Sequence, residues 1–238
     1  MKTSACPSGV LARRWKHKWR AVWPMGLIAL SAAMGGCQSA PPPLALLQRS
    51  YHPNNIFAFP RKLSPNFQRV AVLPIAAETL GNDLPEGCAT LTPILWDQLL
   101  KTKKFELVAV DPLTLRGGTG QPGWTGLESL PPGFLDFLRR EYACDGILFA
   151  ELTTYHAYAP LAIGWRLKLV DVRTGQVIWS ADELFDATRL SVSHGAQRFA
   201  EPGWAVPFCH TDNPLALESP RQFGNYSAAA LLGTLPGR

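Results

Sequence analysis

Three short apolar runs, separated by two helical patterns, are the feature that most constrains the fold of this chain. The runs are RVAVLPI at 69–75, FELVAV at 105–110 and CDGILFAEL at 144–152. They are too short for typical helices and rich in Val, Leu and Ile, so we expect each of them to be a strand. Parallel strands covered on both faces have this continuous apolar character.

The two segments between these runs have the periodicity of helices. In 92–105, apolar residues recur every three or four positions, Thr92 stands where an N-cap is expected and Pro93 occupies the first helical position. The apolar residues of 134–142 are also four positions apart. We therefore predict a helix in each segment, and a loop in 116–133, which is rich in Gly and Pro.

A β-hairpin is expected to follow. Residues 162–172 alternate between apolar and polar side chains, as a half-buried strand does, and 176–185 returns after the turn at Arg173-Thr174-Gly175. The order β-α-β-α-β plus a β-hairpin predicts an α/β domain over 69–186. Its mixed sheet should be sandwiched by helices.

The segments on either side of this domain lack a sustained period. Residues 37–68 are rich in Pro, Ser and Asn, and we predict a flexible, irregular tether there. Residues 187–238 are predicted to be an irregular C-terminal extension, with a short helix at 226–232.

The distribution of charge argues against nucleic-acid binding. The formal charge of the whole chain is +5. Six of the 23 Lys and Arg residues stand before Cys37 and none of the 18 Asp and Glu residues does, so 17 basic and 18 acidic residues remain. A basic face for DNA or RNA is therefore not expected in the part that follows Cys37.

The N-terminal segment has the three parts of a secretory signal. A cationic stretch at 11–20 precedes the uncharged, apolar segment 21–34, and the small residues Gly35 and Gly36 lead to Cys37. We predict that 1–36 are a signal peptide. The alternative is a short uncleaved membrane anchor, although a span of the bilayer needs about 20 apolar residues.

The four residues Met34-Gly35-Gly36-Cys37 resemble the lipobox of bacterial lipoproteins. The resemblance implies that the signal is removed and that Cys37 becomes a lipid-modified N-terminus, carrying acyl chains such as palmitate. Several acyl chains would hold the protein stably at a membrane. Gln38 follows, whereas an Asp there would suggest retention in the inner membrane. The expected location is the outer membrane, facing the periplasm, with the inner membrane as the alternative.

The segment 69–186 is similar to a periplasmic domain shared by three groups of envelope proteins. The resemblance is carried by RVAVLPI, KFELVAVD, YACDGILFAEL and, above all, LKLVDVRTGQVIWSAD, with Asp171, the turn Thr174-Gly175 and Trp179. The groups are curli-secretion (CsgG-like) lipoproteins, lipoprotein activators of penicillin-binding proteins, and the N-terminal domain of the Tol-Pal translocation protein. No long amphipathic insertion of the kind that builds the curli secretion barrel is evident.

No catalytic or metal-binding pattern stands out. Cys209-His210 with Asp212 is a tight group of potential ligands, but it falls short of the four that structural zinc sites use. No Gly-x-Ser-x-Gly elbow occurs. We therefore expect no catalytic residue, no cofactor and no bound metal.

Three cysteines remain after the signal and the lipidated Cys37, namely Cys88, Cys144 and Cys209. One disulfide and buried free thiols are both compatible with this number.

Tryptophans are the best candidates for contact with a partner. Trp124 and Trp204 lie in Gly/Pro-rich loops and are predicted partner contacts. Trp96, Trp165 and Trp179 lie on a predicted helix and strands, where core positions are expected.

These features lead to three hypotheses. The first is a membrane-anchored envelope lipoprotein without enzymatic activity, which binds another envelope protein as an accessory or assembly factor. The second is a subunit of an oligomeric secretion channel, which would need a ring and a membrane-inserting segment. The third is a cell-wall hydrolase, which would need a cleft with a perturbed carboxylate or a nucleophile–base pair. The sequence favours the first; it sets neither the partner nor the oligomeric state.

Overall fold

The structure is a computed structural model, and it describes residues 51–77, 83–200 and 215–238. All of these residues belong to one compact unit, Pro41–Arg238.

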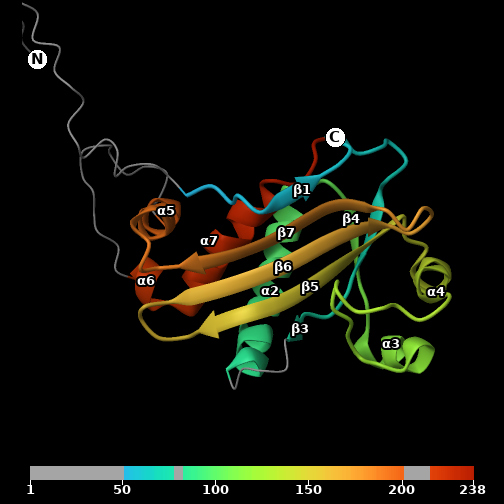
Figure 1. The fold of residues 1–238 in the computed structure, drawn as a ribbon, viewed down its shortest axis with the longest axis horizontal. Coiled ribbons are helices and arrows are strands. Elements are labelled where there is room, and N and C mark those ends of the chain that lie inside the picture. The colour runs from blue at the N-terminus through green and yellow to red at the C-terminus, as the bar shows by residue number, and fades with distance from the viewer. Residues whose placement is uncertain (1–50, 78–82, 201–214) are drawn as a thin grey trace, which may run out of the picture. The chain divides into compact units, whose positions relative to one another are not determined.

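A seven-stranded mixed sheet forms the centre of this unit (Figure 1). Its order is β1-β7-β6-β5-β2-β4, and β3 pairs with β5 beyond the end of β2. Strands β2, β4 and β5 run parallel, while β5, β6, β7 and β1 alternate in direction. The strands are β1 (Ile56–Ala58), β2 (Arg69–Val72), β3 (Ala76–Ala77), β4 (Glu106–Ala109), β5 (Gly146–His156), β6 (Ala162–Asp171) and β7 (Val177–Asp186).

Helices cover the two faces of the sheet unequally. Helices α2 (Leu84–Thr102) and α7 (Pro220–Leu232) lie along one face and enclose the larger apolar core (Figure 1). Helices α3 (Pro112–Thr119) and α4 (Phe134–Tyr142) contribute to a smaller core against the other face. The described residues also include α5 (Leu190–Ala200) and the short α6 (Leu215–Glu218).

Close approach and buried polar pairs fix α7 against the sheet and α2. A Cβ on Gly224 would lie 2.5 Å from the Leu91 side chain, so the small residue lets the two helices meet. The indole N–H of Trp165 on β6 donates to the Ser227 hydroxyl on α7 over 3.0 Å. The indole N–H of Trp179 on β7 donates likewise to Thr234, beyond the end of α7. Both indoles are fully buried, and these two hydrogen bonds replace the bonds that their N–H groups would make with water.

The predicted α/β class and the order of elements over 69–186 are confirmed. The predicted helix at 134–142 has the observed bounds of α4. The hairpin of β6 and β7 turns at Gly175, whose φ of +69° suits glycine.

The prediction that a helix begins at Thr92 is wrong. Helix α2 begins at Leu84, with Pro85 in its first turn, where a missing N–H does no harm. Thr92 lies inside the helix, and its hydroxyl donates to the Cys88 carbonyl over 2.7 Å. Pro93, expected at the first position of the helix, also lies inside α2.

The loop predicted at 116–133 also begins too early. Residues Pro112–Thr119 form α3, because Asp111 caps the helix by accepting the Thr114 N–H over 2.8 Å and Pro112 suits its first turn. The helix ends at Gly120, whose φ is +88°.

The described parts of the segments on either side of the domain contain more regular structure than the sequence predicted. Tyr51, Leu63 and Phe67, expected in a flexible tether, are buried in the core, and β1 pairs with β7. The described part of 187–238 is largely helical rather than irregular, and the short helix expected at 226–232 begins earlier, at Pro220, after the N-cap Ser219.

Candidate protein-binding surface

A half-open apolar groove lies where the parallel strands β2 and β4 end. It is lined by the segment Leu73–Ile75 and by Val110 and Pro112, which follow these strands, and by Leu95 and Trp96 of α2. Its volume is about 190 Å³. In open α/β sheets, the carboxyl ends of parallel strands are a usual place for ligands, and apolar pockets accept anchoring side chains. We call this feature the β4 groove.

Trp96 gives the groove its largest side chain. It is half-buried, and Leu100, one turn further along α2, is 50% exposed. Beyond the groove, Leu113 on α3 is 78% exposed. Large apolar residues at such exposure are costly to hydrate, so this surface gains free energy if a partner covers it.

Strand β4 itself is an edge of the sheet. It pairs with β2 on one side and has no further neighbour in the strand order of the described residues. An edge strand has backbone N–H and C=O groups that can pair with another chain. The β4 groove therefore combines an apolar pocket with a short, accessible strand edge.

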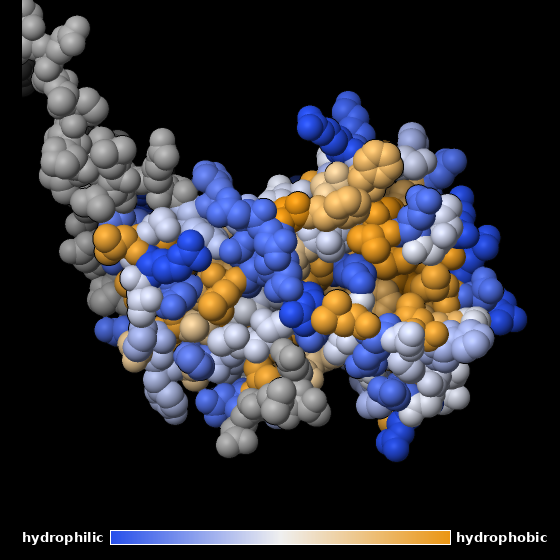
Figure 2. Space-filling view, viewed as in Figure 1, coloured by the Kyte–Doolittle hydropathy of each residue, from blue (hydrophilic) through white to orange (hydrophobic). Residues whose placement is uncertain are grey.

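The sheet face that α3 and α4 leave partly uncovered has an ion-pair ladder across three strands. Arg166 on β6 contacts Glu151 on β5 at 3.0 Å and Asp182 on β7 at 2.9 Å. Burial by itself would lower the pKa of Arg166, but the two carboxylates outweigh it and raise that pKa. Since Arg166 stays charged and paired with both carboxylates, the ladder fixes strand register better than it would serve acid–base chemistry. Figure 2 shows hydrophobic patches interrupted by hydrophilic ones on the face toward the viewer.

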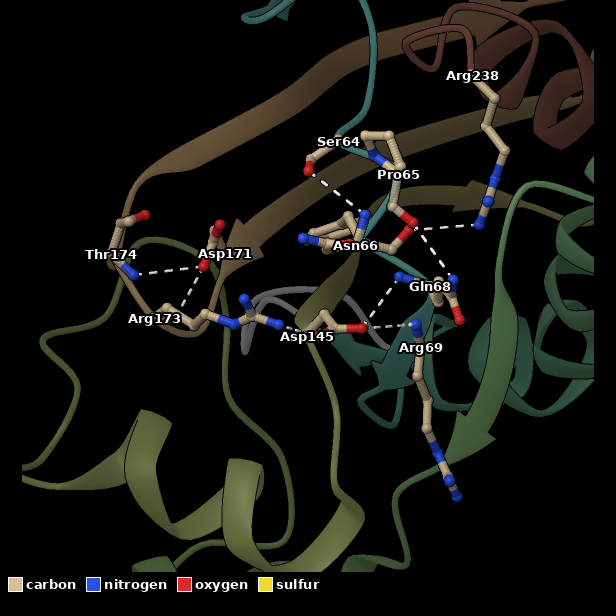
Figure 3. Close-up of polar contacts among 11 residues, drawn as sticks. Ser64, Pro65, Asn66, Gln68, Arg69, Asp145, Asp171, Arg173, Thr174 and Arg238 are labelled. Atoms are coloured by element: carbon tan, nitrogen blue, oxygen red, sulfur yellow. Dashed lines mark hydrogen bonds and ion pairs between the residues drawn. The ribbon is translucent and has the colours of Figure 1, made fainter.

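Asp145 ties the beginnings of two strands to the β6–β7 turn (Figure 3). Its carboxylate accepts the backbone N–H groups of Gln68 and Arg69 over 3.0 and 3.1 Å, and it contacts the Arg173 guanidinium at 2.5 Å. Asp171 accepts the N–H groups of Arg173 and Thr174 within the turn itself. Asp145 and Asp171 therefore organise the turns and strand starts at this end of the sheet.

The hydrogen bonds of Asp145 also affect its ionisation. Burial would raise the pKa of Asp145, but the N–H groups of Gln68 and Arg69 and the Arg173 guanidinium together lower it below its usual value. The carboxylate is thus held in its ionised form, as a structural acceptor.

Of the three site residues predicted from the sequence, Cys37, Trp124 and Trp204, the structure describes Trp124. Cys37 and Trp204 lie outside the described residues. Trp124 is 6% exposed, and its indole N–H donates to the Thr119 hydroxyl over 2.9 Å while its ring packs edge-on against Phe134. The prediction that Trp124 is an exposed partner contact is therefore corrected: the loop folds back and buries the ring in the smaller core.

The other tryptophans differ in burial. Trp165 and Trp179 are core residues, as expected, whereas Trp96 is half-buried: it packs against the larger core and lines the β4 groove. A signal was present in the sequence, since Trp96 and Leu100 recur at helical spacing on a side of the helix that the buried Leu91, Leu95 and Leu99 do not occupy.

Cys88 and Cys144 have free thiols. Burial raises the pKa of both, which disfavours the reactive thiolate. Cys209-His210 and Asp212 lie outside the described residues. Among the residues that are described, no group of three His, Cys, Asp or Glu side chains could hold a metal ion.

The helices of the described residues include none that combines the length and the apolar character needed to cross a bilayer.

Comparison with known proteins found solved structures to which this chain is similar, all at low sequence identity. No family model matches it, and no curated protein does. A solved structure of the PelC dodecamer from Paraburkholderia phytofirmans is 16% identical, with a TM-score of 0.46, and the match covers 77% of this chain and 96% of that one. The C-terminal domain of LpoB from Salmonella enterica is 20% identical with a TM-score of 0.34, over 59% and 90% of the two chains.

Lipoprotein GNA1162 from Neisseria meningitidis is 16% identical with a TM-score of 0.33, over 50% of this chain and 79% of that one. LpoB and a lipoprotein are thus among the similar structures. These matches concern the arrangement of helices and strands, and the function must be argued from the chain's own residues.

Proposed function

We propose that this protein is an envelope lipoprotein without enzymatic activity, tethered through Cys37, whose α/β domain binds another envelope protein at the β4 groove. The single observation that carries the binding role is the half-open apolar groove around Trp96 at the edge of the sheet. The tether rests on the lipobox-like Met34-Gly35-Gly36-Cys37 and on the basic and apolar segments before it. The outer membrane, facing the periplasm, is the proposed location.

The polar groups of the described residues support a binding role over a catalytic one. Glu151 is almost fully buried but paired with Arg166, and Asp145 is held by backbone N–H groups and Arg173. A carboxylate that acts as a general acid or base must be able to exchange its proton near neutral pH. Both carboxylates are instead engaged in fixing strands and turns.

The shape of the β4 groove indicates the chemistry of the partner. A volume of about 190 Å³ is large enough for one or two apolar side chains but smaller than the usual site of a cofactor. The neighbouring edge of β4 can add an extended backbone segment by hydrogen bonding. The partner is therefore expected to present a short extended segment with an apolar or aromatic anchor.

Site-specific crosslinking in the living cell tests this proposal. A photoreactive amino acid replaces Ala109, which lines the β4 groove and is exposed, or Tyr158, which is 86% exposed in the β5–β6 loop. The Ala109 probe should crosslink one defined envelope protein, identified by mass spectrometry. Trp96→Ala should reduce this product by roughly tenfold or more, as expected for a binding hot spot, and Trp96→Phe should retain most of it.

The result that would overturn the binding role is equally specific. Crosslinking at Ala109 no stronger than at Tyr158, or unchanged by Trp96→Ala in a folded protein, would show that the groove is not the contact.

A further inference from the structure

A second surface, distinct from the β4 groove, gathers exposed aromatic and basic side chains. After β1, the chain passes beside its own C-terminal residues: Lys62 and Gly237 pair as a β-bridge, and the Leu63 N–H donates to the Gly237 carbonyl over 2.8 Å. Figure 1 shows the C-terminus next to the segment that leaves β1. We call the exposed residues of this region, Phe57, Phe59, Arg61, Lys62 and Arg238, the basic-aromatic corner.

The two phenylalanines point away from the core for a reason visible in the strand. Ile56 and Ala58 pair with Ala181 and Trp179, and Ile56 packs against the core. Side chains two apart on a strand share a face, so Phe57 lies on the opposite one. Phe59 follows directly after the strand. Phe57 and Phe59 are 50% and 68% exposed.

Basic side chains flank these rings. Arg61, Lys62 and Arg238 are exposed, and the Arg238 guanidinium is held close by donating to the carbonyl oxygens of Lys104 and Phe67. The segments 57–64, 103–105 and 233–238 contain no Asp or Glu. Above β1 and beside the C-terminus, Figure 2 shows hydrophobic spheres next to strongly hydrophilic ones.

We infer that the basic-aromatic corner docks on the phospholipid surface, with its cations at anionic headgroups and its phenylalanine rings at the boundary of the acyl chains. This inference rests on the proposed lipid anchor, which would keep the domain next to a bilayer. Exposed aromatic rings beside Lys and Arg are suited to this interface, since the rings leave water while the cations stay with phosphate.

The length of the chain agrees with this arrangement. Residues 38–50 connect Cys37 to Tyr51, which is buried near the start of β1. A fully extended segment of that length spans roughly 45 Å at most. The domain is therefore never far from the membrane, and a weak surface contact is enough to orient it, because tethering raises the effective concentration of the two surfaces.

A lipid-crosslinking map tests the inference directly. The full-length protein, purified from membranes, is reconstituted into vesicles of phosphatidylethanolamine with photoactivatable phosphatidylglycerol. After illumination, mass spectrometry locates the attached lipid and also records whether Cys37 is acylated. We expect attachment within 57–62 and at Arg238, above the level at the exposed Tyr158.

Two pairs of substitutions separate docking from folding. Arg61→Gln with Lys62→Gln should reduce lipid attachment at the corner by at least about tenfold, since each cation strengthens binding to an anionic surface about fivefold. Phe57→Ser with Phe59→Ser should reduce it as well. The matched control, Tyr158→Ser with Arg140→Gln, changes exposed residues elsewhere and should leave the map unchanged.

The outcomes distinguish the inference from the proposed function. An acylated Cys37 with lipid attached mainly at other surfaces, such as the exposed Leu190 and Phe199 of α5, would overturn the docking site and leave the anchor intact. A chain without acylation that still attaches lipid at 57–62 would support the docking site and refute the anchor. Equal attachment in the wild type and in the Arg61→Gln, Lys62→Gln variant would overturn the role of the cations, and with it the inference.

Discussion

The β4 groove and the basic-aromatic corner lie at opposite ends of the same parallel strands. The groove is at the carboxyl ends of β2 and β4 and is almost entirely apolar. The corner lies toward the amino ends of these strands, where Arg238 donates to the carbonyls of Phe67 and Lys104, and it combines rings with cations. One small domain can thus present an apolar pocket to a protein and a charged surface to lipid, because the rigid sheet keeps the two apart.

The two surfaces also differ in how firmly they are built. The corner is supported by the fully buried Trp179 on β7, which pairs with Ala58 on β1. It is also supported by the hydrogen bonds of the Asp145 carboxylate, which we call the Asp145 network. The groove has at its rim the half-buried Trp96. Loss of Trp179 should therefore affect folding strongly, and loss of Trp96 should affect it less.

The largest effect is expected from Trp179→Ala. It removes a fully buried indole and its hydrogen bond to Thr234, so the free energy of unfolding should fall by about 3–5 kcal/mol. Urea unfolding followed by circular dichroism measures this loss. A decrease below about 1 kcal/mol would contradict the view that the corner has the firmer support.

Asp145→Ala should have the next largest effect. The substitution leaves the Gln68 and Arg69 N–H groups and the Arg173 guanidinium without their acceptor, at an expected cost of about 1–3 kcal/mol. Glu141→Ala, at an exposed position on α4, is the matched control and should change stability by less than about 0.5 kcal/mol. Equal effects of the two substitutions would show that the Asp145 network does not hold the strands.

The same carboxylate predicts a dependence on pH. Because the pKa of Asp145 is lower in the folded protein than in the unfolded chain, its contribution is complete above the unfolded value of about 3.9 and is lost as the pH falls through the folded value. The difference in unfolding free energy between the wild type and Asp145→Asn should therefore be largest near neutral pH and shrink below about pH 4. A difference that grows on acidification would have the wrong sign.

The smallest effect on stability is expected from Trp96→Ala. Since Trp96 is half-buried and packs against the core at one side only, the free energy of unfolding should fall by about 1 kcal/mol, well below the loss for Trp179→Ala, while crosslinking from Ala109 should be reduced about tenfold. Thermal unfolding measures the first effect and the crosslinking experiment the second. A loss comparable to that of Trp179→Ala would mean that Trp96 is a core residue, as the sequence suggested.

The sequence predicted the sheet better than it predicted either surface. Strands β2, β4, β5, β6 and β7 and helix α4 follow from apolar periodicity, and the β6–β7 turn follows from Thr174-Gly175, all of which are local signals. Strand β1, in the predicted tether, and β3 were not predicted. The start of α2 was missed because Pro93 can stand either at a helix start or, with the loss of one hydrogen bond, inside a helix. Trp124 was misplaced because a Gly/Pro-rich loop does not reveal that it folds back onto Phe134.

The β4 groove could not be predicted, since its walls come from three segments that meet in space alone. Residues 72–75, Trp96 and 109–112 are brought together by the parallel pairing of β2 with β4. The basic-aromatic corner has a local signal, the alternation of Phe57 and Phe59 before Arg61 and Lys62. Its Arg238 contribution depends on the C-terminal residues that pair with the chain after β1.

The intact mass of the protein from the membrane fraction tests the central claim, a lipid-tethered domain, most directly. The account predicts a chain that begins at Cys37 and has added acyl mass, and it predicts the loss of both features in Cys37→Ser. A full-length chain that retains residues 1–36 and has no acyl mass would contradict the account.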